Sequence, residues 1–117
     1  MGTRSLTRIY DADPKVPILT IYRQYDGNPE GHGLELAEIL SGMKIVNGFS
    51  QTGPKIANGM GCLAAKVLCA LKSASETGGI YVQAHDTKDA GQDYQYENRI
   101  TRIPMQGRPS GAQIICR

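Results

Sequence analysis

Segment 22–33 carries the densest group of side chains that could do chemistry. It reads YRQYDGNPEGHG and combines tyrosine, arginine, histidine and acidic residues with three glycines. It leaves an expected strand and enters an expected helix, and free backbone N–H groups at a helix N-terminus attract anions. Glycines also let a ligand approach the backbone closely. The pattern predicts a loop in which Arg23, Tyr25 and His32 contact a base or a phosphate group.

The same loop has a second interpretation, a tight strand-to-helix turn whose glycines serve backbone geometry alone. It is not a phosphate-binding P-loop, because Gly27, Gly31 and Gly33 have a different spacing and no Lys-Ser/Thr pair follows them. Both interpretations are open from the sequence.

The two histidines are the candidates for acid–base chemistry. His32 lies among the acidic residues of segment 22–33, and His85 is followed by Asp86, so either ring has a carboxylate nearby in sequence. Residues 85–87 also match the H-x-T half of a two-histidine phosphoesterase motif, but that chemistry needs two copies and only one is present. A histidine-dependent phosphodiesterase is therefore the weaker alternative. No cluster has the spacing of a zinc site, and no metal or cofactor is expected.

Length, charge and cysteine content limit the class of protein. With 117 residues, 40% of them apolar, the chain is expected to form one α+β domain over 1–117. Four arginines and no acidic residue lie from Arg99 onward, yet the net charge of +2 is far from that of a duplex-DNA binder. Three cysteines without C-x-x-C spacing and the lack of an apolar signal or membrane-length run predict a cytoplasmic protein.

Hydrophobic periodicity predicts the elements that position these residues. The order ββααβββ predicts an α+β fold: an antiparallel sheet of four to five strands, with two helices packed on one face. The first two strands are expected to form a hairpin. Gly59 and Gly61 weaken the first turns of the second helix, unless that helix begins near Met60. The expected strands cover 3–10, 16–25, 80–84, 94–103 and 112–116, and the expected helices cover 33–42 and 55–74.

Four segments carry a resemblance to a known family: MGTRSLT at 1–7, the loop 22–33, IANGMGCLAA at 56–65 and GGIY at 78–81. Together they are similar to short uncharacterised proteins of tailed-phage and prophage genomes, over most of the chain. The resemblance implies a small accessory protein of the host cytoplasm, which inhibits a host protein or binds and removes a nucleotide signal of antiviral defence. Arg4, in the first segment, is then either an edge cation or a pocket residue paired with a carboxylate such as that of Asp26.

These observations favour a binding protein without catalysis, whose ligand is anionic and nucleotide-like. A homo-oligomer is expected, because burial at a subunit interface would help so small a chain to enclose a ligand. The alternative is an inhibitor or adaptor whose exposed tyrosines and arginines dock on a host protein. Neither a membrane nor duplex nucleic acid is expected as a partner. The predicted ligand-binding residues are Arg4, Tyr22, Arg23, Tyr25, Asp26, Gly27, Gly31, His32, Gly33, and, at the start of the second helix, Asn58 and Gly59.

Overall fold

The first two strands form a hairpin inside the main sheet. β1 (Ser5–Tyr10) and β2 (Pro17–Arg23) pair antiparallel, with Ser5 opposite Arg23. The expected hairpin is confirmed, and β2 has a neighbour on each side. The computed structural model describes residues 2–46, 48, 53–75, 78–101 and 111–116.

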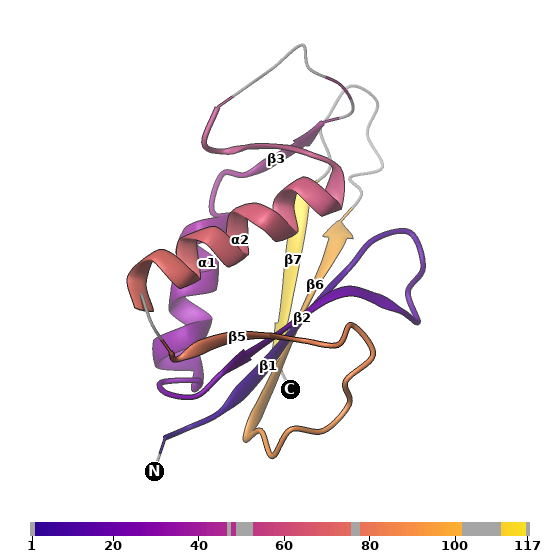
Figure 1. Ribbon diagram of the computed structural model, residues 1–117. Helices are drawn as coiled ribbons and strands as arrows, with labels where there is room; N and C mark the ends of the chain where they lie inside the picture. Colours follow the sequence, from indigo (N-terminus) through magenta and orange to yellow (C-terminus); the bar gives the residue numbers. More distant parts are fainter. Residues whose placement is uncertain (1, 47, 49–52, 76–77, 102–110, 117) are drawn as a thin grey trace.

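The main sheet is mixed, and the prediction of an antiparallel sheet is wrong. β5 (Ile80–Gln83), β6 (Tyr94–Thr101) and β7 (Gly111–Cys116) complete the order β5-β2-β1-β6-β7, with β6 parallel to β1 (Figure 1). Segment 84–93 is the reason. It is no hairpin turn but a crossover, which carries the chain from the outer side of β2 to the far side of β1. Such a connection allows the next strand to run parallel to its neighbour.

A second, two-stranded sheet replaces the expected start of the second helix. β3 (Lys44–Val46) and β4 (Ile56–Asn58) pair in parallel. Helix α2 (Gly59–Ser75) therefore begins after β4 and not at residue 55, which agrees with the alternative start near Met60. Gly59 has a φ of 82°, a left-handed conformation that glycine adopts without steric cost, and it turns the chain from strand to helix.

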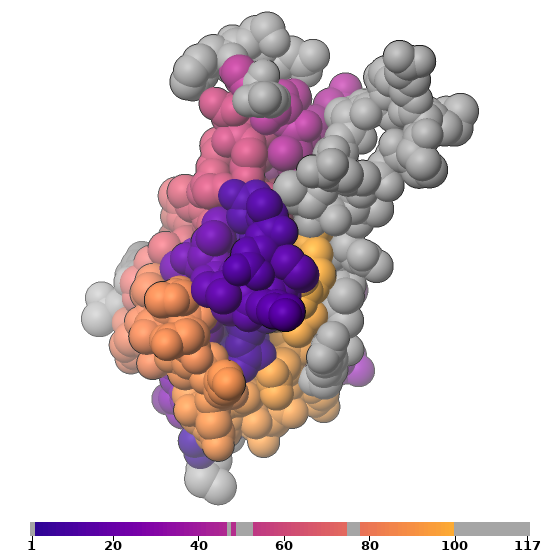
Figure 2. Space-filling model, turned by 90° about the vertical axis from the view of Figure 1, so that its right-hand side faces the viewer, coloured from indigo at the N-terminus to yellow at the C-terminus, as the bar shows by residue number. Residues whose placement is uncertain are grey.

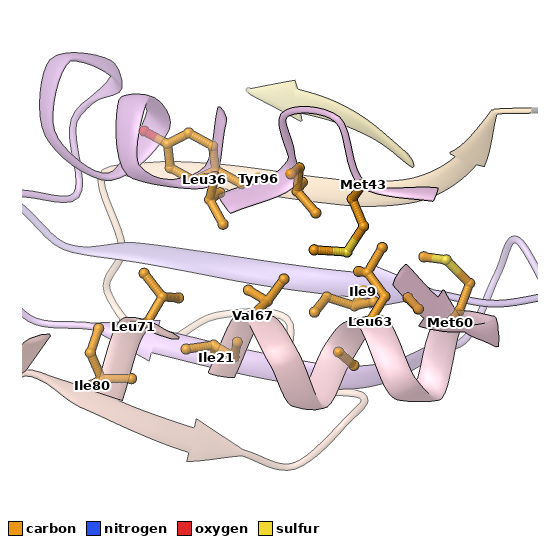
Figure 3. Close-up of a cluster of buried hydrophobic side chains, with 13 residues drawn as sticks. Ile9, Ile21, Leu36, Met43, Met60, Leu63, Val67, Leu71, Ile80 and Tyr96 are labelled. Atoms are coloured by element: carbon orange, nitrogen blue, oxygen red, sulfur yellow. The ribbon is translucent and has the colours of Figure 1, made fainter. Parts of the chain in front are cut away.

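Both helices pack on one face of the main sheet, as predicted (Figure 1). The first expected helix is a π-helical turn, η1 (Pro29–Gly33), followed by α1 (Leu34–Leu40). The α2 residues of the core recur every three or four positions, and Figure 3 shows them between the sheet and the helix. No described helix is long and apolar enough to cross a membrane. The core comprises Ile9, Ile21, Leu36, Leu40, Met43, Ala57, Met60, Leu63, Ala64, Val67, Leu71, Ile80 and Tyr96.

The two faces of the sheet have different neighbours. Side chains of β1 alternate between them, so Thr7 points to the helices and Arg8 points to the opposite face. The crossover 84–93 lies against that opposite face, where the hydroxyl of Thr20 donates a hydrogen bond of 2.8 Å to the carbonyl oxygen of His85. Chemistry-bearing residues can therefore gather on two separate sides of one sheet.

Candidate functional site

Arg23 is the centre of a hydrogen-bonded cluster on the helix side of the sheet. Its guanidinium donates to the carbonyl oxygen of Tyr25 at 2.6 Å, to Nδ1 of His32 at 3.2 Å and to Oε1 of Glu35 at 3.0 Å. The contact with Glu35 is a salt bridge. Since β2 ends at Arg23 and Glu35 lies in the first turn of α1, this side chain ties the end of the strand to the beginning of the helix.

His32 is fully buried, and both of its ring nitrogens are engaged. A guanidinium can only donate, so Nδ1 accepts the hydrogen bond from Arg23. Nε2 then carries the ring proton and donates to Oγ1 of Thr7 at 2.6 Å. The ring also packs edge-on against Tyr96, at 4.9 Å between centroids, and the Tyr96 hydroxyl donates to the carbonyl oxygen of Gly27 at 2.7 Å. A ligand therefore cannot reach this imidazole unless the loop opens.

This environment keeps His32 neutral. Burial first, and then the positive charge of Arg23, lower the pKa of His32 from 6.5 to about 4, against an opposing effect of Glu35. A histidine that activates a hydroxyl must present its unprotonated nitrogen to it. Here the nitrogen that faces the Thr7 hydroxyl carries the proton. The geometry therefore does not support phosphodiesterase chemistry at His32.

Four backbone N–H groups of the loop, including those of its three glycines, already have acceptors. A Cβ at residue 31 would lie 2.6 Å from the carbonyl oxygen of Asp26, so glycine is needed there for close packing of the loop on itself. These contacts match the tight-turn interpretation, since satisfied N–H groups are not available to an anion. The N–H groups of Gly27, Gly31, His32 and Gly33 donate to carbonyl oxygens of Thr3, Asp26 and Asn28 at 2.8–3.3 Å.

Tyr22 and Arg4 do not join the Arg23 cluster. The ring of Tyr22 lies on the opposite face of the sheet, 6.2 Å from the ring of Tyr81 between centroids. The Arg4 carbonyl accepts hydrogen bonds from the N–H groups at positions 93 and 94, where the crossover joins β6. The pairing of Arg4 with Asp26 is not formed, because the salt bridges between described residues are Arg23–Glu35 and Arg99–Glu97.

Asn58 and Gly59 also lie apart from the loop. They stand at the start of α2, whereas the cleft beside Arg23 is lined by Leu71, about 18 Å further along the helix axis. The side chain of Asn58 accepts a hydrogen bond of 3.0 Å from the N–H of Gly48, which fixes the turn after β3. The predicted single site is therefore distributed over separate parts of the molecule.

Three predicted residues, Arg23, Tyr25 and Asp26, do share a cleft, of about 180 Å³. Glu35 lines it as well, so one guanidinium meets two carboxylates. The guanidinium is already paired with one of them. An anion would meet net negative charge at this position, so the cleft does not suit the predicted ligand.

A second cleft, of about 240 Å³, lies on the opposite face of the sheet. It opens between the segment that follows β1 and the crossover, which meet on the surface seen in Figure 2 in indigo and orange. Three cationic side chains and one carboxylate line it, so its net charge is positive, whereas the net charge of the first cleft is negative. Its lining residues are Arg8, Tyr10, Lys15, Val16, Pro17, Asp86, Thr87 and Lys88.

Arg8 is the buried cation of this second cleft and is 8% exposed. Its guanidinium donates to the side-chain oxygen of Gln95 and to the carbonyl oxygens of Thr87 and Lys88, at 3.3 and 2.9 Å. All three acceptors are neutral, and no carboxylate of the described residues lies within salt-bridge distance. A buried charge is costly without a counter-charge. An anion bound in the cleft would supply the negative counter-charge that the three neutral acceptors of Arg8 do not supply.

A stacked pair closes one side of the second cleft. The Arg99 guanidinium lies 3.9 Å from the ring centre of Tyr10, donates to the carbonyl oxygen of Pro14 at 3.1 Å and forms a salt bridge of 3.2 Å with Glu97. These contacts hold the segment after β1 against β6. The Tyr10 ring is buried and covered, so it is not free to stack on a ligand. The other arginines of the C-terminal group lie outside the described residues.

Arg8 is absent from the predicted ligand-binding residues, and its burial in the structure is what singles it out. It is the charged residue of a first strand whose six residues are all buried, and arginine is rarely buried without partners. Its partners lie 79 to 87 positions further along the chain. The sequence therefore gives no means of locating the cleft around it.

The fold and the two clefts define a small α+β protein with a mixed main sheet. Comparisons of the chain with protein-family models, with curated proteins and with solved structures give no match. Within the part of the chain that the structure describes, no three histidine, cysteine or acidic residues are grouped so as to hold a metal ion. The resemblance to phage accessory proteins therefore stays a prediction.

Proposed function

We propose that this protein binds a small anionic ligand, without converting it, in the cleft beside Arg8. The observation that carries the proposal is a buried guanidinium whose protein acceptors are all neutral, at the side of an open cleft. A guanidinium fork matches two oxygens of a phosphate or carboxylate group. Lys15 and Lys88 add charge from the two segments that form the cleft.

The size of the cleft limits the ligand. Its volume of about 240 Å³ is below the roughly 300–1,000 Å³ of pockets that enclose drug-sized molecules. It suits a phosphate group and little more. Since Arg99 covers one face of the Tyr10 ring and Tyr10 is 7% exposed, the described lining offers little aromatic surface to a base. A nucleotide-like ligand would therefore place its phosphate against Arg8 and leave its sugar and base at the rim.

Binding fits this cleft better than catalysis does. Its described lining contains neither histidine nor cysteine, which are frequent bases and nucleophiles in enzymes. His32 is buried on the other side of the sheet, next to Arg23. His85 is exposed on the crossover but is not part of the lining.

The proposal is tested by NMR titration of isotope-labelled protein with inorganic phosphate and with pyrophosphate. We expect saturable shift changes confined to Arg8, residues 15–17 and residues 86–88. Replacing both cleft lysines, Lys15→Gln with Lys88→Gln, should weaken pyrophosphate binding by about tenfold or more. Native mass spectrometry of freshly purified protein will show whether a small molecule is retained, and its mass on release.

The matched control is the double variant Lys44→Gln with Lys66→Gln. It has the same net charge as the cleft variant but changes lysines on β3 and α2, away from the cleft. Equal weakening in the two double variants, or shift changes spread over the whole surface, would show that the anion responds only to overall charge. Either result would overturn the proposal.

A further inference from the structure

β5 is an edge strand of the main sheet, and its outer side is open. It pairs with β2 alone, at the end of the strand order opposite to β7 (Figure 1). Antiparallel partners exchange hydrogen bonds at alternate residues. Because the N–H of Gln24 donates to the carbonyl oxygen of Gly79 opposite it, the backbone groups of residues 79, 81 and 83 face β2. Those of Ile80 and Val82 point outward.

The outward backbone groups of these two residues differ in their hydrogen-bond partners. Ile80 is occupied: its N–H donates to the carbonyl oxygen of Gly78, and its own carbonyl oxygen accepts from Nζ of Lys72 at 3.0 Å. For Val82, no hydrogen-bond partner of the outward N–H and C=O lies within the described residues. Val82 thus presents one free donor and one free acceptor side by side at the edge.

The sequence of β5 itself has none of the usual protections of an edge strand, although Lys72 of α2 covers the carbonyl oxygen of Ile80 and lies 5.6 Å from the Tyr81 ring centre. Natural edges carry lysine, proline or a bulge that discourages pairing with another chain. The strand reads Ile-Tyr-Val-Gln, without a charge or a proline, and its register with β2 is regular. Tyr81 and Val82 are also 49% and 57% exposed. Exposed apolar side chains and the free backbone groups of Val82 therefore lie on the same short strand.

We propose that β5 pairs antiparallel with β5 of a second copy of this chain, with Val82 opposite the partner's Val82. The donor and the acceptor of this residue complement those of an identical residue across a two-fold axis. In this register Val82 packs against the partner's Val82 on the helix side of the sheet. Tyr81 lies diagonally beside its counterpart and opposite the partner's Gln83 on the other side.

A second copy fits this edge better than a partner of another kind. The four residues of β5 carry no charge that would select a basic or acidic peptide. The cation beside them, Lys72, is held at the carbonyl oxygens of Gly78 and Ile80 and not at Val82. The dimer also closes on itself, because a two-fold axis pairs the same edge of both copies. The other edge strand of the sheet, β7, lies against β3 and α1. A strand of four residues limits the contact, so we expect a dimer with a dissociation constant on the order of micromolar. This inference does not depend on a ligand in the Arg8 cleft.

Sedimentation velocity over a range of protein concentrations tests the dimer. The natural chain should shift from monomer to dimer as concentration rises. Val82→Lys places two like charges opposite each other and should weaken the dimer by about tenfold or more. The matched control is Leu34→Lys, which changes a residue of similar exposure on α1, 59% against 57% for Val82, and should leave the dimer intact.

Mixing two variants tests the register. Val82→Lys and Val82→Glu proteins should each be mainly monomeric, and an equimolar mixture should form a heterodimer, because opposite charges then face each other. In the natural chain, the Val82 amide should exchange its hydrogen more slowly at high than at low protein concentration, which does not depend on any variant being folded. A natural chain that stays monomeric up to millimolar concentration, or a Val82→Lys protein that dimerises as well as Leu34→Lys, would overturn the proposal.

Discussion

Arg23, which is partly buried, and Arg8, which is buried, lie on opposite faces of one sheet, and they meet opposite surroundings. Arg23 points toward the helices, where it has a carboxylate, Glu35, and a neutral imidazole as partners. Arg8 points away from the helices and is held only by an amide and two carbonyl oxygens. Burial alone therefore does not distinguish a structural arginine from a binding arginine. What distinguishes them is whether the protein supplies the counter-charge.

The difference separates the expected roles of the two side chains. In the Arg23 cluster both ring nitrogens of His32 and all three nitrogens of the Arg23 guanidinium have hydrogen-bond partners. A complete cluster of buried hydrogen bonds fixes the strand-to-helix turn. The Arg8 cleft is open at the surface and has a net positive charge, because three cationic side chains and one carboxylate line it. Changes at Arg23 should therefore reduce stability, whereas changes at Arg8 should reduce ligand binding.

The largest effect is expected from Arg23→Met. It leaves Nδ1 of His32 buried without a donor and removes the partner of Glu35, so we expect the free energy of unfolding to fall by about 3 kcal/mol. Arg8→Met removes a buried charge that has no carboxylate partner, so its cost should be about 1 kcal/mol. Urea unfolding at neutral pH measures both values.

A control for this pair is Glu35→Gln, which keeps an acceptor for Arg23 while removing the negative charge. Since the Glu35 side chain is 41% exposed, its loss should cost less than about 1 kcal/mol. The comparison between the two arginines fails if Arg8→Met destabilises the chain as much as Arg23→Met does.

A smaller effect concerns the pH dependence that His32 gives to the Arg23 cluster. Above pH 6.5 the ring is neutral in both the folded and the unfolded chain, and it adds no pH dependence. Below pH 6.5 the unfolded chain takes up a proton that the folded ring, with a pKa of about 4, does not accept. Stability therefore falls as pH decreases from 6.5 toward 4, by about 2 kcal/mol between pH 6.5 and pH 5.

Urea unfolding at several pH values measures this loss. His85→Gln, at the exposed histidine, should retain it, whereas His32→Gln should show less of it. The ¹⁵N shifts of the His32 ring should also report a proton on Nε2 and no titration from about pH 7 to pH 5. A ring that becomes protonated in this interval would show that Arg23 and burial do not exclude the proton.

Local patterns predicted much of the fold, and distant pairings account for the errors. The β1–β2 hairpin and the apolar face of α2 follow from residues close together in sequence. The parallel pairing of β6 with β1 joins segments about 90 residues apart, and no periodicity encodes it. The short strands β3 and β4 are likewise stabilised by each other and by neighbouring elements, so their sequences alone resemble a link and the beginning of a helix.

The candidate site shows the same division. The composition of the loop 22–33 marks it as unusual, but the sequence does not show whether its polar groups face a ligand or one another. The structure directs them inward, to Thr7, Tyr96 and the loop's own carbonyl groups. Arg8 lies in a strand position that no local sequence pattern marks. The crossover brings the carbonyl groups of Thr87 and Lys88 to it.

The smallest effects distinguish two glycines of the Arg23 region. A Cβ at Gly31 would lie 2.6 Å from a backbone carbonyl oxygen, so Gly31→Ala should destabilise the chain by about 1–2 kcal/mol. At Gly33 the nearest atom would be 3.5 Å away and φ is −59°, so Gly33→Ala should stabilise it by about 0.5 kcal/mol. Thermal or urea unfolding measures both changes. If the glycines made room for a ligand instead, Gly31→Ala would leave stability unchanged and weaken anion binding, and the loop, not the Arg8 cleft, would be the binding site.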